Sequence, residues 1–215
     1  MPAEPPVDWA AFWDQRYNRP DYAFGQEANT HLRSQAWRLA PGSTVLVPAD
    51  GEGRNGVFLA TAGHRVTSVD ISPLGCAKAQ RLAEQCGVQV TVVQADLEQW
   101  SWPVAAAGTG VGAVVSIFFH LPPELRRALH RRMAEALAPG GLIILEGYHP
   151  DQIPLKQQYG SGGPGDARLL YTPEMLTEDF HDLSIVELTS GRVTLAEGPL
   201  HSGPAAVTRG IWRRD

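Results

Sequence analysis

The sequence has little cysteine and no metal-ligand spacing, and both absences exclude classes of site. Only Cys76 and Cys86 occur, both within one predicted helix. Ten helical residues separate them by about 15 Å, which is beyond disulfide reach. A disulfide scaffold or a cysteine zinc site is therefore excluded. The seven histidines are scattered, with no pair or cluster at the spacing of metal ligands, so we expect no metal.

Excess positive charge and long apolar runs are also missing. The formal net charge is −5, which argues against nucleic acid or an anionic membrane as a main partner. No stretch approaches the roughly 18 apolar residues of a membrane span, and the first residues do not form a signal peptide. We therefore expect a cytoplasmic protein with neither partner.

What is present is the composition of a globular chain. Of its 215 residues, 43% are hydrophobic and 19% are charged, which favours one domain over residues 1–215. Within it we expect an N-terminal helical cap or lid over 1–40 and a core over 41–215. The sequence does not indicate an oligomeric state.

Strands and helices alternate through the middle of the chain. Short apolar runs predict buried strands at 44–49, 65–70, 88–94, 113–119 and 142–147, with helices at 54–62, 73–86 and 122–137 between them. Alternation of this kind predicts right-handed crossovers and a parallel sheet covered on both faces.

The last third of the sequence departs from that order. A long polar segment at 149–172 is interpreted as a loop, followed by a short helix at 173–180. Two final strands, 184–190 and 205–214, have no helix between them. They predict an antiparallel hairpin at the sheet edge, joined by a loose loop at 195–204. The predicted fold is α/β: a Rossmann-like, doubly wound, seven-stranded, mostly parallel sheet with a C-terminal antiparallel hairpin.

A glycine turn follows the first strand. Gly51-x-Gly53-x-x-Gly56 matches the dinucleotide fingerprint, although the turn alone indicates only an anionic ligand. Asp70 lies 19 residues after Gly51, at the end of the second strand, where a carboxylate accepts hydrogen bonds from ribose hydroxyls. An adenosine-bearing cofactor is thus indicated, either NAD or S-adenosylmethionine. The alternative role for Asp70 is the N-cap of the next helix.

Three features favour S-adenosylmethionine. Ala49 and Asp50 separate the strand from its first glycine, "QADLEQW" places Asp96 where it could meet an adenine amino group, and "MAEALAPGGLIILEGY" forms a helix, turn and strand. With "FWDQRYNRPDYAFGQEANTHL", "ADGEGRNGVFLATAGHRVTSVDIS" and "SIFFHLPPELRRALHRRMAEALAPGGLIILEGY", they make the chain resemble the class I S-adenosylmethionine-dependent methyltransferases. Within that class it is most similar to small bacterial enzymes near the tellurite-resistance and thiopurine methyltransferases.

The resemblance implies S-adenosyl-L-methionine as cofactor, with S-adenosyl-L-homocysteine as product, and assigns roles to residues of this chain. The loop of Ala49, Asp50, Gly51 and Gly53 would surround the methionine part, with Asn55 as a further cofactor residue. Asp70 would hold the ribose, and Ile71, Asp96 and Leu97 would contact the adenine. The strand end of Ser116, Ile117 and Phe118 would lie below the reacting methyl. The chain departs from the family where Val47 replaces an acidic residue and Ala49 replaces a glycine.

Methyl transfer needs alignment more than acid–base chemistry. His120, at the end of the fourth strand, is a candidate base for a protonated nucleophile, or else hydrogen-bonds the neighbouring turn. Thiolates or reduced tellurium and selenium species would need no base.

Aromatic residues and loops around these motifs supply further candidates. The aromatic opening, with Trp9, Trp13, Tyr17, Tyr22 and Phe24, could form a lid over the cofactor, since electron-rich faces stabilise a sulfonium. Within it the loop of Tyr22, Phe24 and Gly25 is the better candidate for contact. Trp9 and Trp13, at helical spacing, favour simple packing onto the sheet. The candidates for substrate contact, or for mobile surface loop, are His149, Tyr159 and Arg168.

The resulting hypothesis is a methyltransferase for a small-molecule acceptor: a thiol, a thiopurine-like compound, or a tellurite- or selenite-like species. The alternatives are a protein lysine methyltransferase, a catalytically silent cofactor-binding module and, with least support, an NAD-dependent oxidoreductase.

Overall fold

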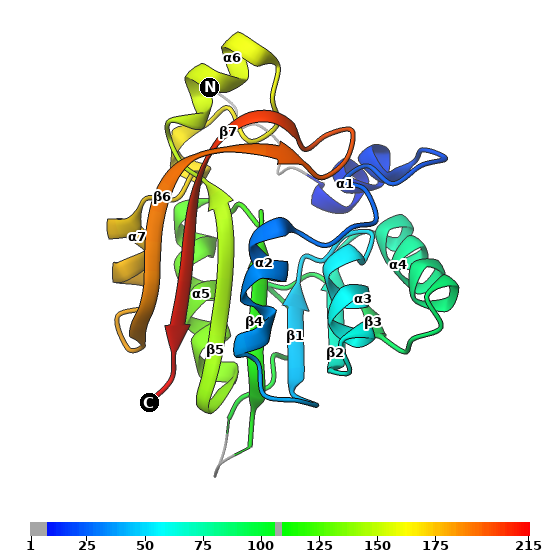
Figure 1. The fold of residues 1–215 in the computed structure, drawn as a ribbon, viewed down its shortest axis with the longest axis vertical. Coiled ribbons are helices and arrows are strands. Elements are labelled where there is room, and N and C mark those ends of the chain that lie inside the picture. The colour runs from blue at the N-terminus through cyan, green and yellow to red at the C-terminus, as the bar shows by residue number, and fades with distance from the viewer. Residues whose placement is uncertain (1–7, 106–108) are drawn as a thin grey trace.

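A computed structural model describes residues 8–105 and 109–215 of the chain (Figure 1). One sheet of seven strands runs in the order β3-β2-β1-β4-β5-β7-β6. The strands are β1 (Thr44–Pro48), β2 (Arg65–Asp70), β3 (Thr91–Gln94), β4 (Val111–Ile117), β5 (Leu137–Tyr148), β6 (Ser184–Ala196) and β7 (Ser202–Arg213). The α-helices are α1 (Trp9–Tyr17), α2 (Thr30–Gln35), α3 (Arg54–Thr61), α4 (Pro73–Gln85), α5 (Pro123–Ala136), α6 (Gln152–Tyr159) and α7 (Pro173–Asp179), and the 3₁₀ turns are Ala36–Arg38 and Ala167–Leu169.

The strand directions confirm the predicted fold class. β1 pairs in parallel with both β2 and β4, and the parallel ladder continues to β3 on one side and β5 on the other. β7 lies antiparallel between β5 and β6. The chain order therefore reverses between β1 and β4, and in open α/β sheets ligands bind outside the carboxyl ends of the strands at such a reversal.

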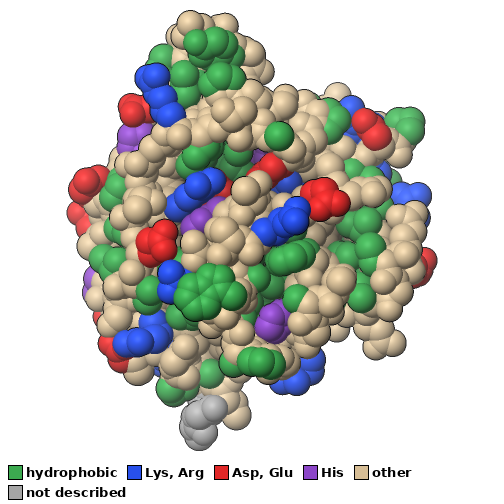
Figure 2. Space-filling view, in the orientation of Figure 1, with side chains coloured by type: hydrophobic (Ala, Val, Ile, Leu, Met, Phe, Trp, Pro, Cys, Tyr) green, Lys and Arg blue, Asp and Glu red, His purple; other side chains and the backbone are tan. Residues whose placement is uncertain are grey.

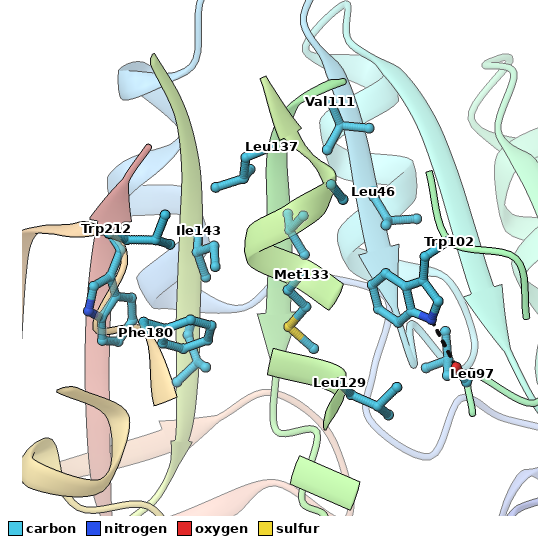
Figure 3. Close-up of a cluster of buried hydrophobic side chains, with 14 of the residues drawn as sticks. Leu46, Leu97, Trp102, Val111, Leu129, Met133, Leu137, Ile143, Phe180 and Trp212 are labelled. Atoms are coloured by element: carbon cyan, nitrogen blue, oxygen red, sulfur yellow. Dashed lines mark hydrogen bonds between the residues drawn. The ribbon is translucent and has the colours of Figure 1, made fainter. Parts of the chain in front are cut away.

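Each central strand is buried on both faces. Leu46 packs with α5 and α7, whereas its neighbours Val45 and Val47 pack with α2 and α3 on the opposite face. Figure 3 shows the first of these clusters, in which Met133 and Leu129 of α5 point toward the strands. At its edge, Trp102 Nε1 donates a 2.8 Å hydrogen bond to the Leu97 carbonyl, closing the turn after β3 (Figure 3). Alternate strand residues thus belong to two different cores, which explains the uninterrupted apolar runs.

Two predicted loops were wrong. The polar segment 149–172 contains α6, whose Pro154 lies in the first turn, where a missing N–H is tolerated, and whose end is capped by left-handed Gly160. Half of the loop expected at 195–204 is strand, because β6 and β7 stay paired from Ser184 with Arg213 up to Ala196 with Ser202. Only residues 197–201 form the turn, hereafter the hairpin tip.

Several elements gather beyond the carboxyl ends of the parallel strands. Figure 1 shows α1, α6 and the curved ends of β6 and β7 above the tip of β1, while the carboxyl terminus lies at the opposite end. Charged side chains of both signs are interspersed over the face shown in Figure 2. Helices α1 and α6 and the ends of β6 and β7 thus lie at the sheet edge where the strand order predicts a ligand.

Within the described part of the chain, no helix has the length and apolarity to cross a membrane.

Candidate functional site

Among the residues that the structure describes, two non-glycine residues have left-handed backbones, and both lie at the reversal point of the sheet. Ala49 follows β1 and Phe118 follows β4, each with φ of 53°. Such conformations cost about 1–3 kcal/mol and cluster at functional sites. Ala49 occupies the position where the family resemblance implies glycine, so the loop keeps the glycine-type conformation despite the substitution.

The glycine turn approaches its neighbours closely. Gly53 has φ of 88°, and a Cβ there would lie 2.5 Å from the Cβ of Ala79 in α4. A Cβ on Gly51 would lie 2.4 Å from the Tyr17 hydroxyl. Larger residues would therefore push apart α3, α4 and the segment that covers the loop.

Asp70 is buried at the end of β2 beside this turn. Its carboxylate accepts hydrogen bonds from the backbone N–H of Gly51 (2.8 Å) and of Ser72 (2.9 Å). Burial raises its pKa to about 6, against the lowering effect of those hydrogen bonds. Ser72, whose hydroxyl accepts from Gly75 N–H, is the N-cap of α4, so the N-cap alternative does not describe Asp70.

The Asp50 side chain supports the turn from beneath. Oδ2 accepts from Gly56 N–H (3.1 Å) and from the Ser68 hydroxyl (2.8 Å), while Oδ1 is buried without a hydrogen-bond partner among the described residues. Burial raises the pKa of Asp50 to about 7, although the Ser68 and Gly56 hydrogen bonds oppose the shift. This carboxyl group therefore orders the loop, and the contact of Asp50 with the cofactor stays a prediction.

The predicted adenine side is formed by the ends of β2 and β3. Ile71 is half-buried, and the Asp96 carboxylate accepts from Glu98 N–H (2.9 Å) within a tight turn. The buried Leu97 has its carbonyl occupied by Trp102 and by Arg132 Nη1 (3.1 Å). Several hydrogen bonds hold this turn, and the assignment of its residues to an adenine ring stays a prediction.

The end of β4 forms the floor between the two halves of the sheet. Ser116 and Ile117 are buried, and Ser116 Oγ has no hydrogen-bond partner among the residues described. Phe118 N–H donates to the Glu146 carbonyl at 2.7 Å, which holds the strained turn in place. The Ser116 hydroxyl therefore retains hydrogen-bonding capacity for a ligand.

Helix α1 covers the glycine turn. Tyr17 is 4% exposed, stacks on Trp13 at a centroid distance of 5.7 Å, and touches Gly51 through its hydroxyl. Asp14 accepts hydrogen bonds from the Ser72 hydroxyl and from Leu74 N–H, so α1 is anchored on the start of α4 rather than on the sheet. The helix of Trp9 and Trp13 thus packs on α4, not on the sheet as expected, and the role of its aromatic residues, Tyr17 included, as a lid over the cofactor stays a prediction.

Glu52 ties the glycine turn both to the loop after α1 and, through a buried ion pair, to α4. Glu52 Oε1 pairs with Lys78 Nζ at 2.7 Å, and Glu52 Oε2 accepts from Ala23 N–H at 2.7 Å. Tyr22 donates its hydroxyl to the Lys78 carbonyl (3.2 Å). Glu52 lies between the motif glycines Gly51 and Gly53. The fingerprint leaves this position open, so the sequence motif did not point to Glu52.

A second buried network ties α3 and the N-terminal segment to the hairpin tip. Arg54 Nη2 pairs with Glu197 Oε2 at 2.8 Å, with side-chain exposures of 7% and 4%. Asn29 Nδ2 donates to Glu197 Oε1 (3.0 Å) and to Glu146 Oε2 (2.6 Å). Asn55 Oδ1 accepts from Asn29 N–H (3.0 Å), which gives the predicted cofactor residue a structural contact. These partners are up to 168 residues apart, so the sequence predicts none of the pairs.

His120 has both ring nitrogens occupied by the backbone. Nδ1 lies 2.8 Å from the Leu169 carbonyl, and Nε2 accepts from Tyr148 N–H at 3.1 Å. Burial lowers its pKa to about 4. These contacts require a neutral ring with the proton on Nδ1, which leaves no nitrogen for a substrate proton. The geometry favours the second of the two expected roles, a histidine that hydrogen-bonds the neighbouring turn.

The three predicted substrate residues lie apart. His149 Nδ1 accepts from Asp151 N–H (3.2 Å), Tyr159 is 54% exposed at the end of α6, and Arg168 pairs with Asp166 at 2.7 Å. No hydrogen bond, ion pair or ring contact within 8–105 and 109–215 joins these three to one another. Their assignment to the substrate gains no support from the geometry.

Residues 45–141 match the family model described as "Methyltransferase domain". The chain is 30% identical over 147 residues to the ribosomal protein L11 methyltransferase of Thermus thermophilus, covering 66% of this chain and 55% of that protein. It is 39% identical over 89 residues to the thiopurine S-methyltransferase of Bordetella petrii, covering 40% and 39%. The chain therefore spans about half or less of these relatives' lengths.

Among solved structures, the fold is similar to that of TehB from Haemophilus influenzae. The TM-score is 0.68 at 17% identity, over 96% of this chain and 67% of that one. At this identity the likeness concerns the fold alone.

Proposed function

Since this chain belongs to the class I S-adenosylmethionine-dependent methyltransferases, we propose that it transfers a methyl group from S-adenosyl-L-methionine to a small-molecule acceptor. The observation that carries the proposal is the arrangement at the sheet reversal. The left-handed residues Ala49 and Phe118 flank a glycine turn, and the buried Asp70 lies beside it.

The residues present fit such a cofactor. Asp70 offers carboxylate lone pairs for ribose hydroxyls, the turn through Gly51 and Gly53 admits close backbone approach, and Ser116 Oγ is a buried polar atom still without a partner in the described chain. When bound, S-adenosylmethionine supplies the activated methyl group on its sulfonium. The chain's own task is to hold it, to exclude water and to align the acceptor.

A small acceptor is supported by the cover over the site. Tyr17 lies against the glycine turn, Phe24 contacts the ring of His201 on the hairpin tip, and Glu52 and Glu197 anchor the intervening segment. A macromolecular side chain would have to displace this layer, whereas a small molecule enclosed beneath it would be shielded from water.

The cofactor test is titration calorimetry with S-adenosylmethionine, S-adenosylhomocysteine and NADH. We expect the first two to bind and NADH not to bind. Asp70→Ala should weaken binding by about 100-fold, because two charge-assisted hydrogen bonds are lost. Asp182→Ala, whose side chain is 82% exposed on the turn before β6, is the control and should bind normally. Binding of NADH alone would overturn the proposal.

A protein substrate is the second candidate, since one relative is the ribosomal protein L11 methyltransferase of Thermus thermophilus. Methyl-labelled cofactor should be incubated with thiols, tellurite, selenite and, separately, ribosomal proteins. Label in a small product supports the proposal. Label in protein alone would favour the second candidate, and binding without transfer to any acceptor would indicate a silent cofactor-binding module.

A further inference from the structure

Three carboxylates surround the glycine turn without a cationic partner. Asp50 and Asp70 are 8% and 5% exposed, and Asp14 is half-buried on α1. Asp70 and Asp14 share Ser72, because Asp70 accepts from its N–H (2.9 Å) and Asp14 accepts from its hydroxyl. Asp50 accepts from the hydroxyl of Ser68, two residues before Asp70 on β2. No ion pair within residues 8–105 and 109–215 includes any of the three carboxylates, so hydrogen bonds are their only close polar contacts there.

The cations of this region are bound to other carboxylates. Lys78 pairs with Glu52 at 2.7 Å, and Arg54 pairs with Glu197 at 2.8 Å. The charge of Arg54 lowers the pKa of Asp50, but this effect is smaller than the opposing effect of burial. The turn therefore carries an excess of negative charge when its carboxylates ionise.

Two of these carboxylates occupy helix starts that would otherwise attract an anionic ligand. Asp50 Oδ2 accepts from Gly56 N–H in the first turn of α3 (3.1 Å), and Asp14 accepts from Leu74 N–H in the first turn of α4 (3.1 Å). Helix N-termini carry partial positive charge and bind anions. Here the anions are side chains of the protein itself, so the pyrophosphate of a dinucleotide would meet carboxylates at both helix starts.

One carboxylate oxygen has no partner. Asp50 Oδ1 is buried and accepts no hydrogen bond from any residue that the structure describes, whereas Oδ2 accepts two. Ionising such an oxygen is costly unless a donor or a positive charge lies near it. A cation bound at the turn would stabilise the ionised form without touching Oδ1, because charges interact over several ångströms in a buried site.

We propose that Asp50, with the charge of Asp70 beside it, selects the cationic cofactor over its neutral product. This inference rests on the function proposed above. S-adenosylmethionine and S-adenosylhomocysteine share their adenosine, amino and carboxylate groups, and they differ by a methyl group and by the positive charge on sulfur. That charge stabilises both ionised carboxylates, and the sulfide of the product does not. Loss of the sulfonium charge therefore weakens binding at the turn and promotes release of the product.

The selection links binding of the cation to protons. Burial raises the pKa of Asp50 to about 7 and that of Asp70 to about 6 in the free protein. Besides Asp70 on β2, the ionisable groups near Asp50 are Arg54 on α3, Tyr17 on α1 and Cys76 on α4. Burial raises the pKa of the tyrosine and of the thiol, so both stay neutral. A bound cation lowers the pKa of Asp50, so it should release protons near pH 6.5 and bind more tightly as pH rises from 5.5 to 7.5.

The test is titration calorimetry with S-adenosylmethionine, S-adenosylhomocysteine and sinefungin, a stable analogue with an ammonium group in place of the methyl sulfonium. At pH 7.5 the wild type should bind both cations at least about fivefold more tightly than the neutral product. Asp50→Asn keeps an acceptor for Gly56 N–H and should weaken both cations by about five- to tenfold, with less than about a threefold change for S-adenosylhomocysteine. Asp182→Asn makes the same change of charge on a side chain that is 82% exposed, and it should keep the wild-type preference.

Proton release gives a second readout. Calorimetry at pH 6.5 in PIPES and in imidazole, two buffers of different ionisation enthalpy, measures the protons released on binding. The wild type should release more protons with sinefungin than with S-adenosylhomocysteine, and Asp50→Asn should remove most of that difference. The wild-type preference for the cations should also fall at least about threefold between pH 7.5 and pH 5.5, where Asp50 is largely protonated.

The outcomes separate the two proposals. Equal affinity of the wild type for the cations and the neutral product, or equal weakening of all three ligands in Asp50→Asn, overturns the charge selection while the methyltransferase function stands. A preference that is unchanged between pH 5.5 and pH 7.5, with no extra protons released, overturns the role of Asp50 ionisation. Failure of the wild type to bind any of the three ligands overturns the proposed function itself.

Discussion

The site has two halves, one around the glycine turn after β1 and one around the hairpin tip at 197–201. Their buried polar side chains find hydrogen-bond partners at very different distances along the sequence. Around the turn, Asp70 and Asp50 accept hydrogen bonds from Gly51, Gly56 and other near neighbours, at most 19 residues away. Around the tip, Glu197 is held by Arg54 and Asn29, which are 143 and 168 residues away. The first half is therefore encoded locally and visible as a motif, whereas the second exists only once the chain is folded.

The largest expected effect concerns the two buried ion pairs, one in each half. Glu197→Ala leaves Arg54 buried without its carboxylate and should lower the free energy of unfolding by about 3–5 kcal/mol. Glu52→Ala should cost less, about 2–3 kcal/mol, because Lys78 keeps a 2.7 Å hydrogen bond to the Asp21 carbonyl, whereas the remaining carbonyl contacts of Arg54 are 3.4 Å long. Urea unfolding of both variants measures the difference. Equal costs would contradict the distinction.

The next largest effect concerns the turn half and depends on pH. Asp50 has a raised pKa of about 7 in the folded protein, whereas an unfolded aspartate has a pKa of about 3.9. Between these values the folded state holds a proton that the unfolded chain has lost, so stability should fall as pH rises from about 4 to about 7.

Asp50→Asn cannot ionise and keeps an acceptor for Gly56 N–H, so it should be more stable than wild type by about 2 kcal/mol at pH 8 and nearly equal at pH 4.5. Asp70 has a pKa raised to about 6, so the stability of Asp50→Asn should still fall as pH rises, but by less than that of the wild type. Urea midpoints across this range check both. A difference independent of pH would rule out ionisation as the cause.

A smaller effect tests the close approach of the Gly25 loop to the hairpin tip at Glu197. Gly25 has φ of 73°, and a Cβ there would lie 2.8 Å from the Glu197 carbonyl oxygen. Gly63 has φ of 88° with open space around it. Gly63→Ala should therefore cost only the left-handed strain of about 1 kcal/mol, and Gly25→Ala about 1 kcal/mol more. Thermal unfolding of the pair measures the excess, and equal shifts would mean that the contact yields freely.

The smallest effect is a stabilisation in the turn half. Ala49 has φ of 53°, which glycine adopts without strain, so Ala49→Gly should raise the free energy of unfolding by about 0.5 kcal/mol after the entropy of glycine in the unfolded chain is subtracted. Chemical denaturation against wild type is the measurement. A loss of stability would show that the Ala49 methyl group packs usefully.

The sequence by itself determined the α/β class, the parallel core and the glycine turn with Asp70, because each depends on periodicity or on neighbours within one strand–turn–helix unit. β2 and the start of α4 at Pro73 agree with the predictions to the residue. The sequence did not predict helix α6 or the full length of β6 and β7, because these segments are polar and lack a clear hydrophobic period. Their structure depends on packing and strand pairing with distant parts of the chain.

Tertiary structure alone decided which side chains share the acceptor end. His120 stands in a motif yet has both nitrogens occupied, and His201, in what looked like a loose loop, lies between Phe24 and Phe118 beside Glu197. The physical reason is that strand registry and the antiparallel insertion of β7 beside β5 bring these residues together, and neither leaves a periodic trace in the chain.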